Sequence, residues 1–512
     1  MVKKFLSAGL CCVLLGGCLT SDPAAPAKKD EKKCQQKCDK KAKECPKKAD
    51  KKCDKKAKEC PKKADEKAVK TAPAKKAEKT VPAKKTVKAA PAKKAEKTAP
   101  AKDSFKIEKC TITGKTEADK FVYAPGEKMV FIINFNAGKQ EIPAGKYNLA
   151  ILRDGDDGIN KTEKYDLAKV KEPIRFTTST DKPGFVRVRA VIRNEKNRWI
   201  GKAEQRFEGG AGVGIDQLKP AAQEPADFDA FWASQKKRLD AVPIKAERTL
   251  ISKADAPVLV YAVKIDCAGP RPVTGYLTIP ANAKAKSIAA QVNYQGYGTR
   301  VQTAPKTGPK NKIHLTINAH GYDLGKDKAY YKDFFEKIKS NGKGYAFDPK
   351  QNSDREAAYF NGMALRVMRS LQYVKSLPEW NGKTLIVAGG SQGGLQTMWA
   401  AALDKDVTEA HPSVTWCCDL AGNPKLKRLN GWRPRYVPAL DYYDAVFHAR
   451  RVKCFTTITR AGLGDYVCPP SGLAISYNEL NCPKRITWCQ NSTHGYVQKG
   501  GQRFPMTNKI KK

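Results

Sequence analysis

A serine in a glycine-rich turn carries the strongest chemical signal in this 512-residue sequence. An apolar, β-branched run leads into the pattern Gly-x-Ser-x-Gly, and an alanine-rich helical pattern follows it: Thr384-Leu-Ile-Val-Ala-Gly-Gly-Ser-Gln-Gly-Gly-Leu395. A sharp strand-to-helix turn lifts a serine hydroxyl above a sheet, and its glycines are needed where no Cβ fits. The pattern therefore predicts Ser391 as a nucleophile, rather than a small-residue turn kept for packing alone.

A serine hydroxyl is a poor nucleophile, so a base and an acid must assist it. In α/β-hydrolases they follow in the chain order Ser, Asp or Glu, His. His494 lies in a polar loop after the strand-like run 485–489, and Asp465 lies in the loop that leaves the strand-like run 453–459. These positions predict a triad of Ser391, Asp465 and His494. Two other histidines, His411 and His448, are alternative bases, although their segments look like an ordinary turn and a helix face.

Several segments between about residues 216 and 505 resemble the acetylxylan esterase / cephalosporin-C deacetylase family. They are Gly390-Ser-Gln-Gly-Gly394, Gly462-Leu-Gly-Asp-Tyr-Val-Cys-Pro-Pro-Ser471, His494-Gly495, Pro225-Ala-Asp-Phe-Asp-Ala-Phe-Trp232, Thr274-Gly-Tyr-Leu-Thr-Ile-Pro280 and Tyr294-Gln-Gly-Tyr-Gly298. The resemblance implies a serine esterase that removes O-acetyl groups from acetylated polysaccharides or oligosaccharides, with the triad Ser391, Asp465 and His494. It also implies an oxyanion hole made by the backbone N–H groups of Tyr297 and Gln392.

One segment departs from the family's usual pattern. The family usually carries Arg-Gly-Gln-Gly where this chain has Asn318-Ala-His-Gly-Tyr-Asp323, and a charged, aromatic insertion follows at about residues 326–353. The departure bears on substrate access and on the family's characteristic oligomer, and leaves the triad untouched. A prolyl-oligopeptidase-like serine peptidase and a non-catalytic, surface-anchored polymer-binding protein are the alternative functions. No zinc signature is present, so we expect neither a metal nor another cofactor.

The first 18 residues resemble a bacterial lipoprotein signal peptide. Two lysines precede the short apolar run 5–15, which is too short to span a bilayer, and Leu15-Gly-Gly-Cys18 resembles a lipobox. We therefore expect lipidation of Cys18 and a lipid anchor at the bacterial cell envelope, at the outer membrane or on a periplasmic face. A secreted protein without lipid is the alternative.

Residues 19–103 consist mainly of Lys, Ala, Pro, Glu and Cys, with a 15-residue repeat that begins at Cys38 and again at Cys53. Such a composition cannot bury enough surface to offset the entropy of ordering, so we expect a disordered stalk. The stalk either binds anionic envelope polymers or is a solvated linker without a partner. The formal net charge of the chain is +44, but the expected compartment argues against nucleic acid as a partner.

Two folded modules are expected after the stalk. Residues 104–210 carry short alternating runs between turn residues, which predicts an immunoglobulin-like β-sandwich that either binds glycans or, as we favour, packs on the catalytic module. Within it, Val186, Val188, Ala190 and Ile192 alternate with mostly basic residues, as in a half-buried strand. Residues 216–508 alternate strand and helix patterns, so the fold class is α/β, with an α/β-hydrolase domain. The acetylated sugar, the oligomeric state and any disulfide pairing stay open.

Overall fold

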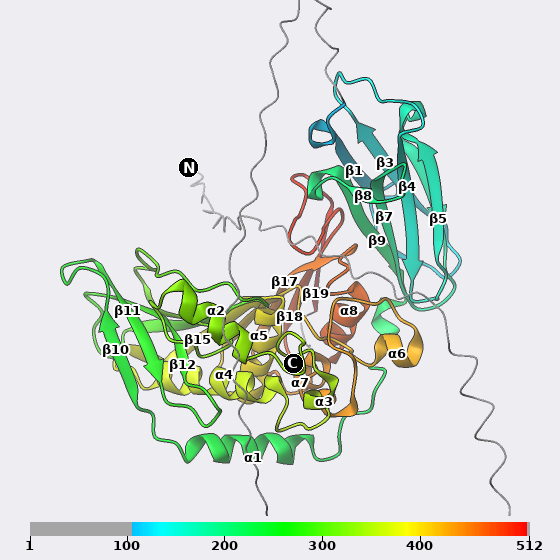
Figure 1. Ribbon diagram of the computed structural model, residues 1–512. Coiled ribbons are helices and arrows are strands. Elements are labelled where there is room, and N and C mark those ends of the chain that lie inside the picture. The colour runs from blue at the N-terminus through cyan, green and yellow to red at the C-terminus, as the bar shows by residue number, and fades with distance from the viewer. Residues whose placement is uncertain (1–104, 509–512) are drawn as a thin grey trace, which may run out of the picture. The chain divides into compact units, whose positions relative to one another are not determined.

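The computed structural model describes residues 105–508 (Figure 1). The predicted signal peptide with Cys18, and the predicted stalk, lie outside these residues. The described chain has an all-β N-terminal module and an α/β C-terminal module, and both belong to one compact unit. Within 105–508, no helix is both long enough and apolar enough to cross a membrane.

The N-terminal module is built from two sheets that enclose one apolar core. The three-stranded sheet is antiparallel and has the order β1 (Thr111–Thr116), β3 (Met129–Asn136), β6 (Ile174–Thr178). The larger sheet has the order β2 (Val122–Tyr123), β9 (Arg206–Val213), β7 (Gly184–Asn194), β4 (Tyr147–Gly155), β5 (Lys161–Asp166), with β8 (Trp199–Ile200) paired to β7. This is the β-sandwich that the alternating runs predict, although β9 continues past residue 210.

Strand β7 differs from its prediction because both of its faces are largely buried. Val186 and Val188 face the sandwich core, as the alternation predicts. Phe185, which points to the opposite face, instead joins the core of the C-terminal module, where its ring centroid lies 5.2 Å from that of Trp488. A neighbouring module therefore covers the face that the sequence pattern assigns to solvent.

The C-terminal module contains a ten-stranded sheet. Its order is β10 (Ala246–Leu250), β11 (Val258–Ile265), β12 (Val273–Pro280), β14 (Lys312–Ile317), β13 (Ile288–Tyr294), β15 (Trp380–Gly390), β16 (Glu409–Ser413), β17 (Phe455–Gly462), β18 (Lys484–Cys489), β19 (Arg503–Asn508). The six strands from β14 to β18 in this order are parallel, whereas the strands outside them pair antiparallel. Parallel strands bring their carboxyl ends to one edge of the sheet, where α/β proteins place their ligands. The sheet and its helices confirm the α/β-hydrolase class.

The helices of this module are α1 (Phe228–Asp240), α2 (Lys328–Lys337), α3 (Pro349–Asn352), α4 (Tyr359–Lys375), α5 (Gln392–Leu403), α6 (Gly422–Leu426), α7 (Ala445–Ala449) and α8 (Pro470–Glu479). Almost all residues of α4 are buried. The helix packs against α1 and α5 as well as against the sheet. Its buried Arg366 and Arg369 donate hydrogen bonds to backbone carbonyl groups of Ala319 and Leu239, respectively.

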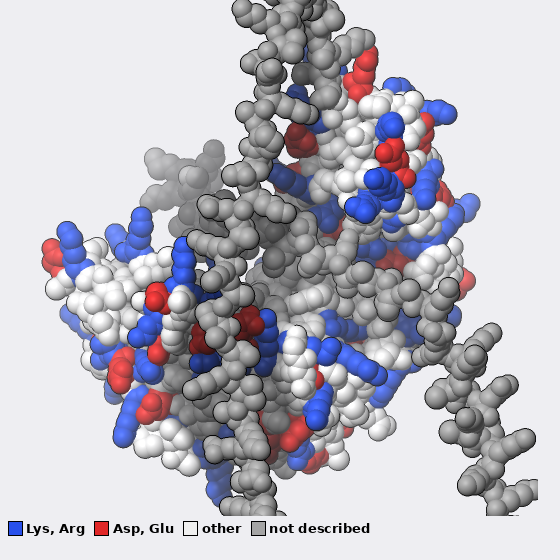
Figure 2. Space-filling view, in the orientation of Figure 1, with Lys and Arg blue, Asp and Glu red and all other residues white. Residues whose placement is uncertain are grey.

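Lys and Arg side chains are spread over the visible faces of both modules, with Asp and Glu side chains between them (Figure 2). The net positive charge of the chain therefore does not by itself locate a ligand.

Candidate active site

Ser391 stands on the turn that joins β15 to α5, in a strained backbone conformation with φ 58° and ψ −120°. A Cβ on Gly389 would lie 2.5 Å from the Gly393 carbonyl oxygen, and one on Gly393 would lie 2.2 Å from the Tyr294 carbonyl oxygen. The two glycines of the Gly-x-Ser-x-Gly pattern are thus sterically required. The Ser391 N–H donates to the Ser413 carbonyl at 2.9 Å, which helps to hold a conformation that costs about 1–3 kcal/mol.

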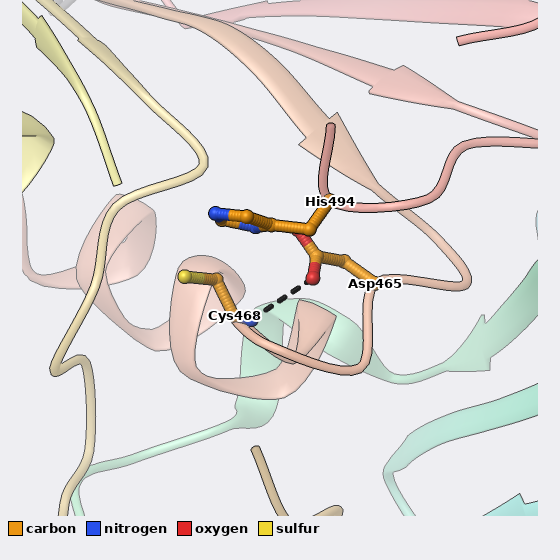
Figure 3. A group of neighbouring side chains, drawn as sticks. All are labelled: Asp465, Cys468 and His494. Atoms are coloured by element: carbon orange, nitrogen blue, oxygen red, sulfur yellow. Dashed lines mark hydrogen bonds and ion pairs between the residues drawn. The ribbon is translucent and has the colours of Figure 1, made fainter. Parts of the chain in front are cut away.

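The predicted acid and base meet at the ends of β17 and β18. Asp465 is fully buried, and its Oδ1 accepts hydrogen bonds from the backbone N–H groups of Val467 (2.8 Å) and Cys468 (3.0 Å). Its Oδ2 lies 2.9 Å from Nδ1 of His494. A carboxylate can only accept, so Nδ1 carries the proton and the other ring nitrogen, Nε2, is free to act as a base. In Figure 3 the imidazole ring of His494 is drawn above the Cys468 side chain, with the Asp465 carboxylate beside it.

Cys468 is a neighbour that the sequence does not single out. Its sulfur and the ligand atoms of Asp465 and His494 lie within 4.8 Å of one another, and the nearby Ser391 side chain acts to lower the pKa of the thiol. Burial holds the pKa of the Cys468 thiol well above its usual range, so the sulfur is a neutral thiol. A metal ligand or nucleophile must be the thiolate, and the carboxylate of Asp465 is already hydrogen-bonded at both oxygens. The cluster therefore suits an acid–histidine pair beside a serine better than a metal.

The predicted oxyanion donors lie side by side with the serine turn. A Cβ on Gly296 would lie 3.5 Å from the Gly390 carbonyl oxygen, and Gln396 Nε2 donates to the Gln295 carbonyl at 3.0 Å. The backbone N–H groups of Tyr297 and Gln392 donate to no other residue within 105–508. Gln392 begins α5, where the first N–H groups of a helix lack intrahelical partners and favour negative charge. Both amides are available to an anion.

Tyr345, in the predicted insertion, supports the loop that carries Tyr297. No sequence pattern identifies this residue. Its hydroxyl donates to Gln392 Oε1 at 3.0 Å and accepts from the Gly298 N–H at 2.9 Å. Its ring stacks on that of Tyr297, with centroids 4.1 Å apart. The insertion and its aromatic composition are visible in the sequence, but no local pattern indicates where Tyr345 points.

His320, in the segment that departs from the family pattern, supports the same loop. Its Nε2 lies 3.0 Å from the Gly298 carbonyl oxygen, and its Nδ1 lies 2.8 Å from the Tyr359 hydroxyl. Burial lowers the pKa of His320 to about 3, so the ring is neutral.

The two alternative bases lie in other surroundings. His448 is fully buried in α7, where its Nε2 lies 3.0 Å from the Tyr442 carbonyl oxygen. His411 lies on β16, with Nε2 3.2 Å from the carboxylate of Glu409. The histidine that contacts Asp465 is His494.

The sandwich contacts both loops that carry the acid and the histidine. Arg187 on β7 donates to the backbone carbonyl of Asp465 at 3.0 Å. The Ser492 N–H donates to the Glu208 carbonyl at 2.9 Å. A Cβ on Gly464 would lie only 2.2 Å from the carbonyl carbon of Glu208. The backbones of the two modules are therefore in direct contact beneath the site.

The class of this chain, a carboxylic ester hydrolase of the α/β-hydrolase fold, follows from comparison with known proteins. Residues 214–504 match the model of the acetyl xylan esterase family (AXE1). That match spans more than half of the sequence, and the chain therefore belongs to the acetyl xylan esterase family, as its motifs predict.

Individual relatives are named as an acetyl esterase or as acetyl xylan esterases. The chain is 29% identical over 318 residues to acetyl esterase Axe7A of Xylanibacter ruminicola (strain ATCC 19189 / DSM 19721 / CIP 105475 / JCM 8958 / 23), a match that covers 59% of this chain and 69% of that protein. Among solved structures it is similar to an acetyl xylan esterase from Paenibacillus sp. R4, with 25% identity, TM-score 0.46, and 55% and 94% of the two chains covered. It is also similar to acetyl xylan esterase 1 from Thermoanaerobacterium sp. JW/SL YS485, with 19% identity, TM-score 0.46, and 56% and 93% covered.

Proposed function

We propose that this protein is a serine esterase that removes O-acetyl groups from xylan-type carbohydrates, with Ser391 as nucleophile, His494 as general base and Asp465 as the acid that orients it. The observation that carries the proposal is the 2.9 Å contact between Asp465 Oδ2 and His494 Nδ1, beside a strained serine turn. Membership in the acetyl xylan esterase family supports the acetyl ester as substrate.

In this mechanism, His494 Nε2 removes the proton of the Ser391 hydroxyl as the oxygen attacks the acetyl carbonyl carbon. General-base assistance of this kind contributes roughly 100- to 10,000-fold in rate. Asp465 holds the ring with its proton on Nδ1 and stabilises the imidazolium that forms. The N–H groups of Tyr297 and Gln392 bind the developing oxyanion, and the loss of one such donor costs about 2.7–4 kcal/mol.

The leaving group and the second half-reaction use the same histidine. The imidazolium of His494 donates its Nε2 proton to the sugar oxygen as the C–O bond breaks, which leaves an acetyl group on Ser391. Water then attacks the acetyl carbonyl while His494 removes a proton from it. Returning that proton to the serine oxygen releases acetate and restores the free enzyme.

The test is acetate release from acetylated xylan and p-nitrophenyl acetate by Ser391→Ala. We expect activity to fall by at least about 1,000-fold while circular dichroism and the unfolding midpoint stay those of the unaltered protein. Cys468→Ser is the paired variant, because a buried neutral thiol next to the serine is expected to be dispensable for the chemistry. Retention of activity by Ser391→Ala, or its loss only in Cys468→Ser, contradicts the assignment. A proline-anilide substrate separates the peptidase alternative, which predicts faster turnover there than on acetyl esters.

We also propose that Cys18 is lipidated and holds the enzyme at the cell envelope, a proposal that rests on the signal-like sequence alone. Cys18→Ala should move the protein from the membrane fraction to the soluble fraction without changing its specific activity. An unchanged membrane fraction in that variant would overturn the anchor.

A further inference from the structure

A pocket opens beside the candidate active site. Its volume is about 560 Å³, within the range of roughly 300–1,000 Å³ that is usual for small-ligand sites. Its lining includes Tyr297, Lys343, Phe347, Pro349, Trp432 and Arg435. Tyr297 is the residue whose backbone N–H we assign to the proposed oxyanion hole, so the pocket shares one residue with the candidate active site. The proposed esterase mechanism uses the backbone N–H of Tyr297 and no side chain of this lining.

The apolar part of the pocket is an aromatic wall. Trp432 is 44% exposed, although it is a large apolar side chain. Its ring centroid lies 4.7 Å from those of both Tyr297 and Phe347. The Trp432 N–H donates to the Val467 carbonyl at 3.1 Å, and Trp416 Nε1 donates to the Trp432 carbonyl at 2.7 Å. The backbone of Trp432 is thus held in place, its ring packs against the neighbouring rings, and the exposed part of the ring suits the C–H face of a pyranose ring.

The charged part of the pocket consists of two cations without counter-ions. The side chains of Lys343 and Arg435 are exposed, and neither forms an ion pair or a side-chain hydrogen bond with another residue of the described range. The lining contains no carboxylate. By contrast, Arg450 and Arg451, at the surface elsewhere, both pair with Glu224. Two unpaired cations around a ring-sized aromatic pocket favour an anionic ring, since a guanidinium binds a carboxylate with two parallel hydrogen bonds.

We propose that this pocket binds a uronic acid unit, a pyranose ring that carries a carboxylate, next to the O-acetyl group that is cleaved. The ring would lie against Trp432, and its carboxylate would be bound by Lys343 and Arg435. This inference rests on the proposed esterase function and narrows its substrate to acidic, acetylated carbohydrate. Lys343 and Phe347 come from the insertion that follows the departure from the family pattern, so this loop contributes one of the two cations and part of the aromatic wall.

The first test compares two acetylated xylo-oligosaccharides. One carries a glucuronic acid substituent, and in the other this substituent is reduced to glucose. Lys343→Gln/Arg435→Gln should lower kcat/KM on the acidic substrate by roughly tenfold, mainly through KM, and on the neutral one by less than about twofold. Added salt should lower kcat/KM of the unaltered protein on the acidic substrate only. The matched control is Lys245→Gln/Lys253→Gln, which removes the same charge from exposed positions at the other end of the sheet. Equal losses on both substrates, or no loss on the acidic one, overturn the subsite.

The second test does not depend on catalysis. Calorimetry measures the binding of glucuronic-acid-substituted xylo-oligosaccharide, without acetyl groups, to full-length Ser391→Ala. We expect binding that weakens by about tenfold when Lys343→Gln/Arg435→Gln is added, and weaker binding of the neutral oligosaccharide. Equal affinity for both sugars, or preferential binding of a simple acidic peptide, would refute the uronic acid assignment. If the unaltered protein releases no acetate but Ser391→Ala still binds the uronate, the proposed esterase function is refuted and the proposed subsite is retained.

Discussion

The candidate site has two walls of different construction. On the side of Asp465 and His494, the sandwich supports the loops through backbone hydrogen bonds, a buried arginine and glycines that allow the chains to touch. On the side of Tyr297, the insertion supports the loop through stacked rings and tyrosine hydroxyl groups, and its outer surface stays open to solvent. The first construction holds the Asp465–His494 pair, which we propose transfers protons, within a buried interface. The second leaves side chains exposed, as substrate selection requires. Reaction and recognition are thus supported by different parts of the chain.

The strongest test of the first wall changes the acid itself. Asp465→Asn should lower kcat by roughly 1,000- to 10,000-fold, because an amide can donate to Nδ1 and so favours the wrong tautomer of His494. KM should change little. Steady-state kinetics on p-nitrophenyl acetate measures both, and Asp255→Asn, an exposed position, is the control. A loss of less than tenfold would show that Asp465 does not orient the base.

Removing the sandwich's contact with the acid loop should have the next largest effect. Arg187→Met eliminates the hydrogen bond to the Asp465 carbonyl and the ion pair with Asp154. We expect a loss of about 2–3 kcal/mol in the free energy of unfolding, below the 3–5 kcal/mol of a fully buried pair because Asp154 is a quarter exposed. Denaturant unfolding tests the loss of stability.

Arg187→Met should also lower kcat by roughly tenfold at temperatures where the variant is folded, since Asp465 is displaced. Arg198→Met, on the exposed edge of the sandwich, should leave both kcat and the free energy of unfolding unchanged. If Arg187→Met destabilises the protein without lowering kcat, the sandwich only stabilises the fold.

On the second wall, Tyr345→Phe should cost about 1–2 kcal/mol of transition-state stabilisation, or roughly tenfold in kcat/KM. The substitution keeps the ring that stacks on Tyr297 and removes the hydroxyl that connects Gly298 to Gln392. Tyr330→Phe is the matched control, because Tyr330 lies in the same insertion and its hydroxyl also accepts a backbone hydrogen bond, from the Asp323 N–H. Equal effects of the two substitutions would mean that the insertion acts only through its stability.

The smallest effect is expected for a substitution of Glu208, a buried carboxylate of the sandwich on the side of Asp465. Burial raises the pKa of Glu208 to about 7, an effect that the nearby Arg206 and Arg189 oppose and that Asp465 reinforces. Because the folded-state pKa is raised, this residue's contribution to stability is fully present below about pH 4.5 and is lost as the pH rises through 7. Glu208→Gln should therefore be more stable than the unaltered protein at pH 8, by about 1–2 kcal/mol, and nearly unchanged at pH 4.5. Urea unfolding at the two pH values measures the difference. If Glu208→Gln has the same stability as the unaltered protein at pH 8, the Glu208 carboxylate is not destabilised by burial.

The sequence predicts those parts of the molecule that depend on local pattern. The glycine pattern around Ser391 predicts the turn because a Cβ on Gly389 would meet a residue four positions away and one on Gly393 would meet the adjacent strand. The positions of Asp465 and His494 follow from the rule that parallel strands end at one edge. The contacts of Arg187 and Tyr345 could not be predicted, because each side chain contacts a segment far away in the chain. The local sequence indicates only an alternating strand around Arg187 and a charged, aromatic insertion around Tyr345. The alternation of β7 was misleading for the same reason, since only the fold places a second module on its outer face.

The contact between Phe185 and Trp488 has a practical consequence for the design of truncated variants. A fragment that begins at residue 214, where the family match starts, retains every residue of the proposed chemistry. It also removes the aromatic ring and the arginine that cover the underside of the acid and histidine loops. Such a fragment would expose an apolar hollow beneath its own reaction centre, so the shortest active enzyme should begin before the sandwich.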